Sequence, residues 1–294
     1  MADNTAARYE HYIPKFYLKG FLDQSRAKKQ HFYVWVYTPN QGAQLRPYTK
    51  VGGEHGFYDH EGGTELEGHL STIEDRAARL QRRLIAKGSL IGADRRAFAD
   101  WVGLMATRGR PFFDMTTRTV NRIHEVLVDD PVLDSTTIAP QQPTRAWVLN
   151  EMIECGHIFG QLFAAMTWWV MQVPSENDGF VTCDTPVMLS DPKGIVLTEK
   201  TVRYSKRSWF TFPLTATHCL HGHFRSTSDE RGRMKPFEFR NVNHHTIGRA
   251  SSEVYAAEKS DAIQRLVDKL VKPRQVHEAA LARDLNDLRE RTKS

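Results

Sequence analysis

The spacing of the hydrophobic positions changes twice along the chain, and each change predicts a different kind of structure. Residues 31–39 alternate aromatic and aliphatic side chains as a strand does, and residues 43–51 form a weaker returning strand after a turn. Residues 64–173 place apolar side chains at steps of three and four, which is the period of a helix. Residues 178–258 return to short alternating segments. This succession predicts an α+β fold, in which helices and strands occupy separate parts of the chain.

We expect a single domain over residues 1–294, with a central helical bundle between an N-terminal β-hairpin region and a C-terminal antiparallel or mixed sheet. A final helix over about residues 260–290, interrupted at Pro273, follows the sheet. The predicted helices of the bundle cover residues 64–88, 94–110, 113–130 and 145–173. The last of these becomes apolar on nearly all sides, so we expect it at the centre of the core.

A glycine-rich segment, residues 50–64, separates the hairpin from the first helix. We expect a flexible connection here and no core element, because glycine leaves the backbone its largest freedom. Its GGEHGF stretch lacks the preceding strand and the following helix that a phosphate-binding loop needs.

The composition is that of a globular protein, with 40% hydrophobic and 26% charged residues in a chain of 294. No apolar run is long enough to cross a bilayer, and the first residues lack the basic and apolar regions of a secretion signal. Cys155, Cys183 and Cys219 form no CxxC pair, which argues against a disulfide framework or a zinc knuckle. We therefore expect a protein of the reducing cytoplasm with no membrane partner.

The net charge of +5 permits nucleic-acid binding without demonstrating it, because an ordinary solvated surface can carry the same excess. Arg108 and Arg110 stand at the end of the second predicted helix. Guanidinium groups suit phosphates, so both are candidate substrate-binding residues. The alternative is that they hydrogen-bond the last carbonyl groups of that helix.

The strongest single signal is the stretch FVTCDTPVML, Phe180–Leu189, in which Asp184 interrupts a strand-like run. Pro186 cannot donate to a sheet ladder, so this stretch belongs at the edge or end of a strand. Asp184 at such an end would act as a general base, as a metal ligand or as the anchor of a catalytic histidine. The alternative is a structural role, in which its carboxylate accepts nearby backbone N–H groups.

His11 opens a short aromatic segment, His11–Phe21, in which Pro14 favours an extended backbone. A histidine fixed against packed aromatic rings is a candidate general acid or base, because imidazole titrates near neutral pH. The alternative is that His11 only hydrogen-bonds a buried backbone group.

Histidines also recur in the predicted sheet. His221 and His223 share one face of a strand, and His244 follows in what we predict to be the next β segment. With Asp184 they are candidate ligands of a divalent metal, although histidines on a strand surface are common. Asn243, beside His244, is a candidate substrate-binding residue.

Four phrases occur in a recognisable order: HYIPKFYL at His11–Leu18, CDTPV at Cys183–Val187, Pro213-Leu214, and the stretch from Asn241 that reads NVNHHTIGRASSEVYA. Together they resemble a bacterial family of unknown function, DUF4238, over most of the chain. The strand-end phrase of that family reads Ser-Asp-Asn-Pro-Val, so Cys183 and Thr185 depart from it here. The resemblance implies an α+β layout and a motif that begins at His11, and it implies no particular activity.

Two functional hypotheses follow. The first is a cytoplasmic phosphodiester hydrolase, a nuclease of bacterial stress or phage defence, with His11 as acid or base and Asp184 as its orienter or a metal ligand. In that hypothesis Arg108, Arg110 and Asn243 hold phosphate, and His11 and Asp184 line one concave surface. The second is a non-catalytic module that binds nucleic acid or protein through a basic groove with aromatic platforms.

Overall fold

A computed structural model of the protein describes residues 9–27, 32–58, 63–128, 143–175, 179–190, 196–197, 202–203, 206–224 and 230–271. The α-helices are α1 (Lys15–Leu18), α2 (Gln24–Ala27), α3 (Gly63–Lys87), α4 (Gly92–Thr107), α5 (Arg110–Val128), α6 (Arg145–Ala165), α7 (Pro236–Arg249) and α8 (Asp261–Leu270). The strands are β1 (Tyr9–His11), β2 (Tyr33–Thr38), β3 (Gly42–Pro47), β4 (Gly53–His55), β5 (Thr167–Gln172), β6 (Thr182–Cys183), β7 (Met188–Ser190), β8 (Val196–Leu197), β9 (Val202–Arg203), β10 (Trp209–Pro213), β11 (His218–His223), β12 (Glu230–Arg233) and β13 (Val254–Ala256). The predicted α+β fold is confirmed.

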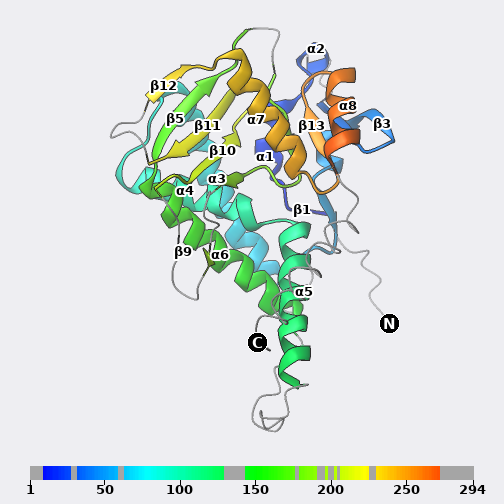
Figure 1. Ribbon diagram of the computed structural model, residues 1–294, viewed down its shortest axis with the longest axis vertical. Coiled ribbons are helices and arrows are strands. Elements are labelled where there is room, and N and C mark those ends of the chain that lie inside the picture. Colours follow the sequence, from blue (N-terminus) through cyan, green and yellow to red (C-terminus); the bar gives the residue numbers. More distant parts are fainter. Residues whose placement is uncertain are drawn as a thin grey trace, which may run out of the picture.

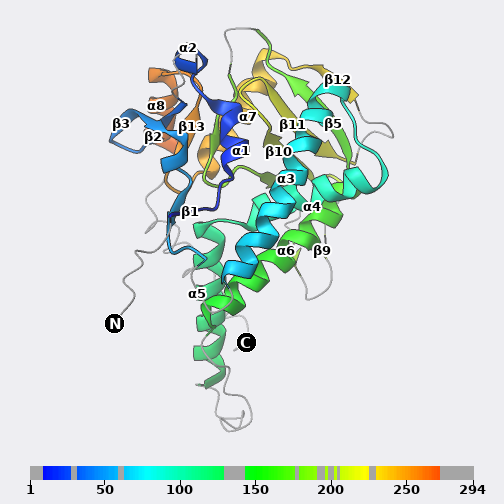
Figure 2. The ribbon, with the colours of Figure 1, turned by 180° about the vertical axis from the view of Figure 1, so that it is seen from behind.

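The largest sheet has the strand order β12-β5-β11-β10-β7. Its strands are antiparallel except for β12, which runs parallel to β5. The sheet is therefore mixed, as predicted. Helices cover both faces: α7 lies over the face seen in Figure 1, and α3 and α4 lie over the face seen in Figure 2.

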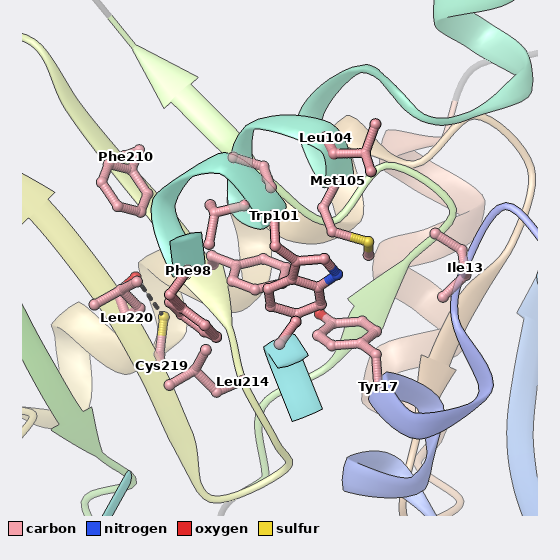
Figure 3. Close-up of a cluster of buried hydrophobic side chains, with 14 of the residues drawn as sticks. Ile13, Tyr17, Phe98, Trp101, Leu104, Met105, Phe210, Leu214, Cys219 and Leu220 are labelled. Atoms are coloured by element: carbon pink, nitrogen blue, oxygen red, sulfur yellow. Dashed lines mark hydrogen bonds between the residues drawn. The ribbon is translucent and has the colours of Figure 1, made fainter. Parts of the chain in front are cut away.

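The face toward α4 and α6 carries the core. Phe98 of α4 packs on Trp168 of β5, and Phe163 of α6 packs on Phe210 of β10. Trp101 lies at the centre of this layer, where its ring contacts the rings of Phe98 and Tyr17 (Figure 3). It also contacts the ring of Phe212. Side chains two residues apart on a strand share a face, so the residues between these core positions point to the opposite side of the sheet.

A second, smaller sheet has the order β3-β2-β13-β6. Its β2–β3 hairpin is the one that the alternating pattern predicted, and its turn places Asn40 and Gly42 at positive φ values of 60° and 75°. A separate apolar cluster joins this sheet to α7 and α8, with Val267 of α8 fully buried. This cluster fixes α7 between the two sheets.

Three sequence predictions are wrong. The predicted helix 145–173 ends at Ala165, and residues 167–172 form β5, because an apolar run that is buried on both faces has no period that separates strand from helix. Asn243 and His244 lie in α7 and not in a strand. The glycine-rich segment holds β4, which pairs with β1, and its Val51, Phe57 and Tyr58 are buried in the core.

Two boundaries also differ from the predictions. The helix predicted over residues 94–110 ends at Thr107, and α5 begins at Arg110 with Pro111 as its second residue, where proline is well tolerated. Of the predicted final helix, Asp261–Leu270 forms α8, and Pro273 and the residues after it lie outside the described part of the chain. Among the described helices, none has the length and apolar character that a bilayer span requires.

Candidate functional site

The face of the large sheet that points away from the core forms a cavity beneath α7. We call it the outer-face pocket. Its floor comes from alternate residues of β5, β10 and β11, and α7 and the turn before β10 form its walls. Its volume is about 500 Å³. The lining residues are Trp169, Met171, Arg207, Ser208, Trp209, Thr211, His221, His223, Met234, Glu238, Asn241, Val242 and His245.

Rings make up most of the floor. The rings of Trp209 and His221 are parallel within 7°, with centroids 6.0 Å apart. Trp169 meets His223 edge to face at 4.6 Å between centroids, and Trp209 lies 5.7 Å from His245 of α7. These side chains stand on neighbouring strands and hold one another in place, so the pocket presents a rigid aromatic surface.

The polar atoms of this floor that have no hydrogen-bond partner in the described part of the chain include the indole Nε1 of Trp169 and the Oγ1 of Thr211, whose residue is 2% exposed. A buried polar group without a partner destabilises a fold by about 1–3 kcal/mol. Such groups are uncommon in native proteins, and those beside a cavity are candidates for contact with a bound ligand or an ordered water.

The two ends of the pocket differ in character. In the register of the sheet, Trp209 is opposite His223, whereas Met171 is opposite Cys219 at the other end of β11. Arg207 is exposed and stands two residues before Trp209, so it lies at the Trp209 end. Met171 and Met234, which follows β12, form the opposite, apolar end.

Glu238 is the acidic residue of the lining, and its carboxylate accepts a hydrogen bond from the Lys235 backbone N at 2.9 Å. This contact caps the start of α7, close to Met234 in the chain. At the other end of α7, burial lowers the pKa of His245, and the neighbouring His244 lowers it further. His245 is therefore neutral at pH 7, and Arg207 brings the permanent positive charge to the Trp209 end.

The candidate metal ligands are divided between different places. His221 and His223 line the outer-face pocket, whereas His244 is exposed on α7 and is not part of the lining. Asp184 lines a different cavity. Within the described residues, no group of three or more His, Cys, Asp or Glu side chains is placed to hold a metal ion.

His11 is engaged in a structural contact. Its Nε2 lies 3.2 Å from the carbonyl oxygen of Thr49, and since a carbonyl only accepts, Nε2 is the donor. Burial lowers the pKa of His11 to about 4, and the positive charges of Lys15 and Arg108 add to this effect. The imidazole is consequently neutral at physiological pH.

Arg108 is 4% exposed and joins several elements near the end of α4. Its guanidinium donates to the Tyr58 hydroxyl, to the Glu74 carboxylate of α3 and, at 2.7 Å, to the His11 carbonyl oxygen. All three of its nitrogens therefore have partners within the protein. The sequence suggested that this arginine binds either a ligand or the end of its own helix, and neither alternative describes the three contacts.

Asp184 and Arg110 line a second cavity of about 480 Å³, together with Tyr12 and Glu54. The Asp184 carboxylate accepts the backbone N–H groups of Ser251 and Ser252 at 2.8 and 2.7 Å, and it also accepts the Ser252 hydroxyl. Burial raises the pKa of Asp184, and these hydrogen bonds oppose the rise. The contacts are those of a carboxylate that ties the end of β6 to the loop before β13.

Arg110 forms ion pairs with Glu54 at 2.7 Å and with Asp114 at 2.8 Å, and its side chain is 40% exposed. His11 is not among the residues that line this cavity, although the adjacent Tyr12 is. Asn243 lies elsewhere: its amide accepts from the Val181 N and donates to the Gly179 O, which fastens α7 to the segment before β6.

The candidate residues thus fall into separate groups, and the outer-face pocket is the place where ring surfaces and unsatisfied polar atoms coincide. Sequence reasoning noted His221 and His223 on one strand face. It missed Trp169 and Thr211, although the alternation of residues in TWWVMQ and WFTFP carried that signal.

Fold and pocket together define an α+β protein with a candidate small-ligand site on the outer face of a mixed sheet. The family model described as "Protein of unknown function (DUF4238)" matches residues 9–260. The chain belongs to this family. A search of the curated proteins and a search of the solved structures each found no match.

The low pKa of His11 predicts a specific loss of stability in acid. An unfolded histidine binds its proton near pH 6.5, whereas folded His11 does so only near pH 4. Its contribution is therefore complete above pH 6.5 and is lost as the pH falls toward 4, on the order of 2 kcal/mol for a partly exposed group. Urea unfolding at pH 7 and pH 4.5 should show a smaller acid loss for His11→Gln than for the wild type. Parallel pH profiles of the two proteins would contradict the assignment.

Proposed function

We propose that the protein is a binding module that takes up a base of a nucleic acid or nucleotide in the outer-face pocket. The observation that carries the proposal is the pairing of an aromatic floor with the unpartnered Trp169 Nε1 and Thr211 Oγ1. A volume of about 500 Å³ lies in the usual range of small-molecule sites. Bases of every kind stack on aromatic side chains, so the floor suits this class of ligand.

The polar atoms favour a heterocycle over an apolar ring. The indole N–H of Trp169 can only donate, so the ligand has to present an acceptor to it. Nucleobases carry ring nitrogens and carbonyl oxygens in the plane of the ring, whereas the side chain of phenylalanine carries neither. This difference supports a nucleobase over a phenylalanine side chain of a protein partner.

A phosphodiester hydrolase, in bacterial stress or phage defence, is the second candidate. The observation that favours it is that Arg110 and Asp184 line the same cavity. The hydrogen bonds of His11 and Arg108 weigh against it, because both groups are already engaged within the protein. Cleavage of labelled RNA or DNA with magnesium or manganese, abolished by His11→Ala in a folded protein, would favour the hydrolase.

We place the protein in the cytoplasm as part of this proposal. Cys155, Cys183 and Cys219 are free thiols, which suits a reducing compartment. Burial raises the pKa of Cys183 and of Cys219 to about 12, so these two thiols are inert side chains of the core.

The Thr211→Val variant tests the binding function by separating stability from affinity. Valine replaces the unpartnered hydroxyl by a methyl group, so the variant should be as stable as the wild type or more stable by about 1 kcal/mol. Its affinity for nucleosides and short single-stranded oligonucleotides should fall about tenfold, because one hydrogen bond to the base is lost. Urea unfolding and titration of the tryptophan fluorescence measure the two effects.

Thr246→Val is the matched control. Thr246 of α7 is 1% exposed and its Oγ1 also has no partner within the described residues, but it is not among the residues that line the pocket. This variant should show the same change in stability with unchanged affinity. The proposal fails if the wild type binds none of the four nucleosides or if both threonine variants bind them equally well.

A further inference from the structure

Resting on the proposed function, we infer that the outer-face pocket recognises a nucleobase together with the phosphate of its nucleotide, with the base over the rings of the floor and the phosphate at Arg207. The shared chemistry is a planar base joined through a sugar to a phosphate group. A free nucleotide and the phosphorylated end of a strand both present it. This inference adds a ligand class and an orientation to the binding function.

The first argument is the polarity of the pocket along the strands. Trp209 and Arg207, two residues apart in the chain, lie at one end, and Met171 and Met234 lie at the other. Thr211 and Trp169, which carry the unpartnered atoms, lie between these ends in the sheet register, because Thr211 and Trp169 are both opposite His221. A ligand seated over the middle of the pocket therefore extends one part of itself toward Met171 and another toward Arg207.

The second argument is the distribution of charge. The carboxylate of Glu238 belongs to the first turn of α7 and disfavours an anion at the methionine end. The guanidinium of Arg207 lies at the opposite end of the pocket, which is the end that Trp209 lines. Guanidinium groups bind phosphate through paired, charge-assisted hydrogen bonds, so the anionic part of the ligand belongs at this end.

Calorimetric titration of the full chain with a nucleoside and with its 5′-monophosphate tests the inference at pH 7.5. For the wild type, the monophosphate should bind at least about tenfold more tightly than the nucleoside, as a charge-assisted hydrogen bond implies. In Arg207→Gln this difference should disappear while the affinity for the nucleoside remains. Arg207→Lys should keep part of the difference, because it retains the charge and loses the planar fork.

Lys206→Gln is the matched control, since Lys206 is the exposed neighbouring cation and is not among the lining residues. It should keep the full preference for the monophosphate. A preference that survives in Arg207→Gln, or its absence in the wild type, would overturn the inference while leaving the binding of bases intact. No binding of the nucleoside by the wild type would instead overturn the proposed function itself.

The two sources of the ligand are separated by a second pair of titrations. A short single-stranded RNA with a 5′-phosphate and the same RNA without it present the strand-end form of this chemistry. If the strand end is the ligand, the phosphorylated RNA should bind at least as tightly as the free monophosphate. If both RNAs bind more weakly than the monophosphate, the ligand is a free nucleotide.

Discussion

The Gly103→Ala variant is expected to lose about 3–4 kcal/mol of its free energy of unfolding, which is a large effect for one added methyl group. Gly103 lies where α4 crosses α6. A Cβ atom built there would stand 2.0 Å from the carbonyl oxygen of Gly156 and 2.5 Å from the backbone nitrogen of Gly160. Both neighbours are backbone atoms of a helix, so relief requires the two helices to move apart.

That movement would disturb the layer of side chains next to the large sheet. α4 and α6 supply Phe98 and Phe163, which pack on Trp168 and Phe210 of the sheet. Interiors packed this closely do not absorb such shifts without losing contacts elsewhere. The measurement is urea unfolding followed by far-UV circular dichroism.

Gly68→Ala is the control for the same chemical change. Gly68 lies in α3, and a Cβ atom built on it would meet nothing within 4 Å. Alanine is favoured over glycine within a helix, so this variant should gain about 0.5–1 kcal/mol. A gain of stability in both variants would contradict the close helix crossing.

The Arg108→Met variant is expected to lose about 3–5 kcal/mol, because it removes one partner of a buried, hydrogen-bonded charge pair. The Glu74 carboxylate, the Tyr58 hydroxyl and the His11 carbonyl would all lose a donor at once. These three groups come from α3, from the segment after β4 and from β1, so the loss would loosen the packing of the N-terminal segment on the helices.

Arg110→Met is the matched control, two residues further along the chain. Its side chain is 40% exposed, and ion pairs of this kind contribute about 0–1 kcal/mol. If Arg108 instead bound a ligand, as one reading of the sequence suggested, Arg108→Met would keep its stability and lose affinity. Thermal and urea unfolding of both variants distinguish the two roles.

The elements that could be predicted from the sequence are those with one solvent-exposed face. α3 and the β2–β3 hairpin keep a clear period, because one side of each carries polar residues. β5 was missed because Trp168 and Trp169 are both in packed surroundings, one in the core and one on the outer-face pocket. With apolar side chains on both faces, the period that distinguishes a strand disappears.

The candidate site could be predicted only in part for a related reason. His221 and His223 were found from their alternation on one strand, which is local information. The contact of Arg108 with Glu74 and the cover that α7 provides over the sheet join residues far apart in the chain. Such pairings arise from the tertiary fold, and a single sequence carries no pattern that predicts them.

One of the positions at which a local rule is broken lies in the outer-face pocket. Thr211 places a hydroxyl without a partner in a buried strand, where valine would give a more stable fold. Departures of this kind are expected at functional sites, because there the requirements of a ligand oppose those of stability. For this reason Thr211 marks the outer-face pocket as the candidate binding site.

The indole N–H resonance of Trp169, in a protein labelled with nitrogen-15, reports directly on binding in the outer-face pocket. The chain has six tryptophans, and a Trp169→Phe variant assigns the resonance by its disappearance. A saturating nucleoside monophosphate should shift the Trp169 resonance, because the indole N–H gains an acceptor, and should shift that of Trp209 as well. The resonance of Trp147, which is exposed on α6, should not move. A Trp169 resonance that stays in place, with or without binding of the ligand elsewhere, would contradict the proposal that the ligand binds in the outer-face pocket.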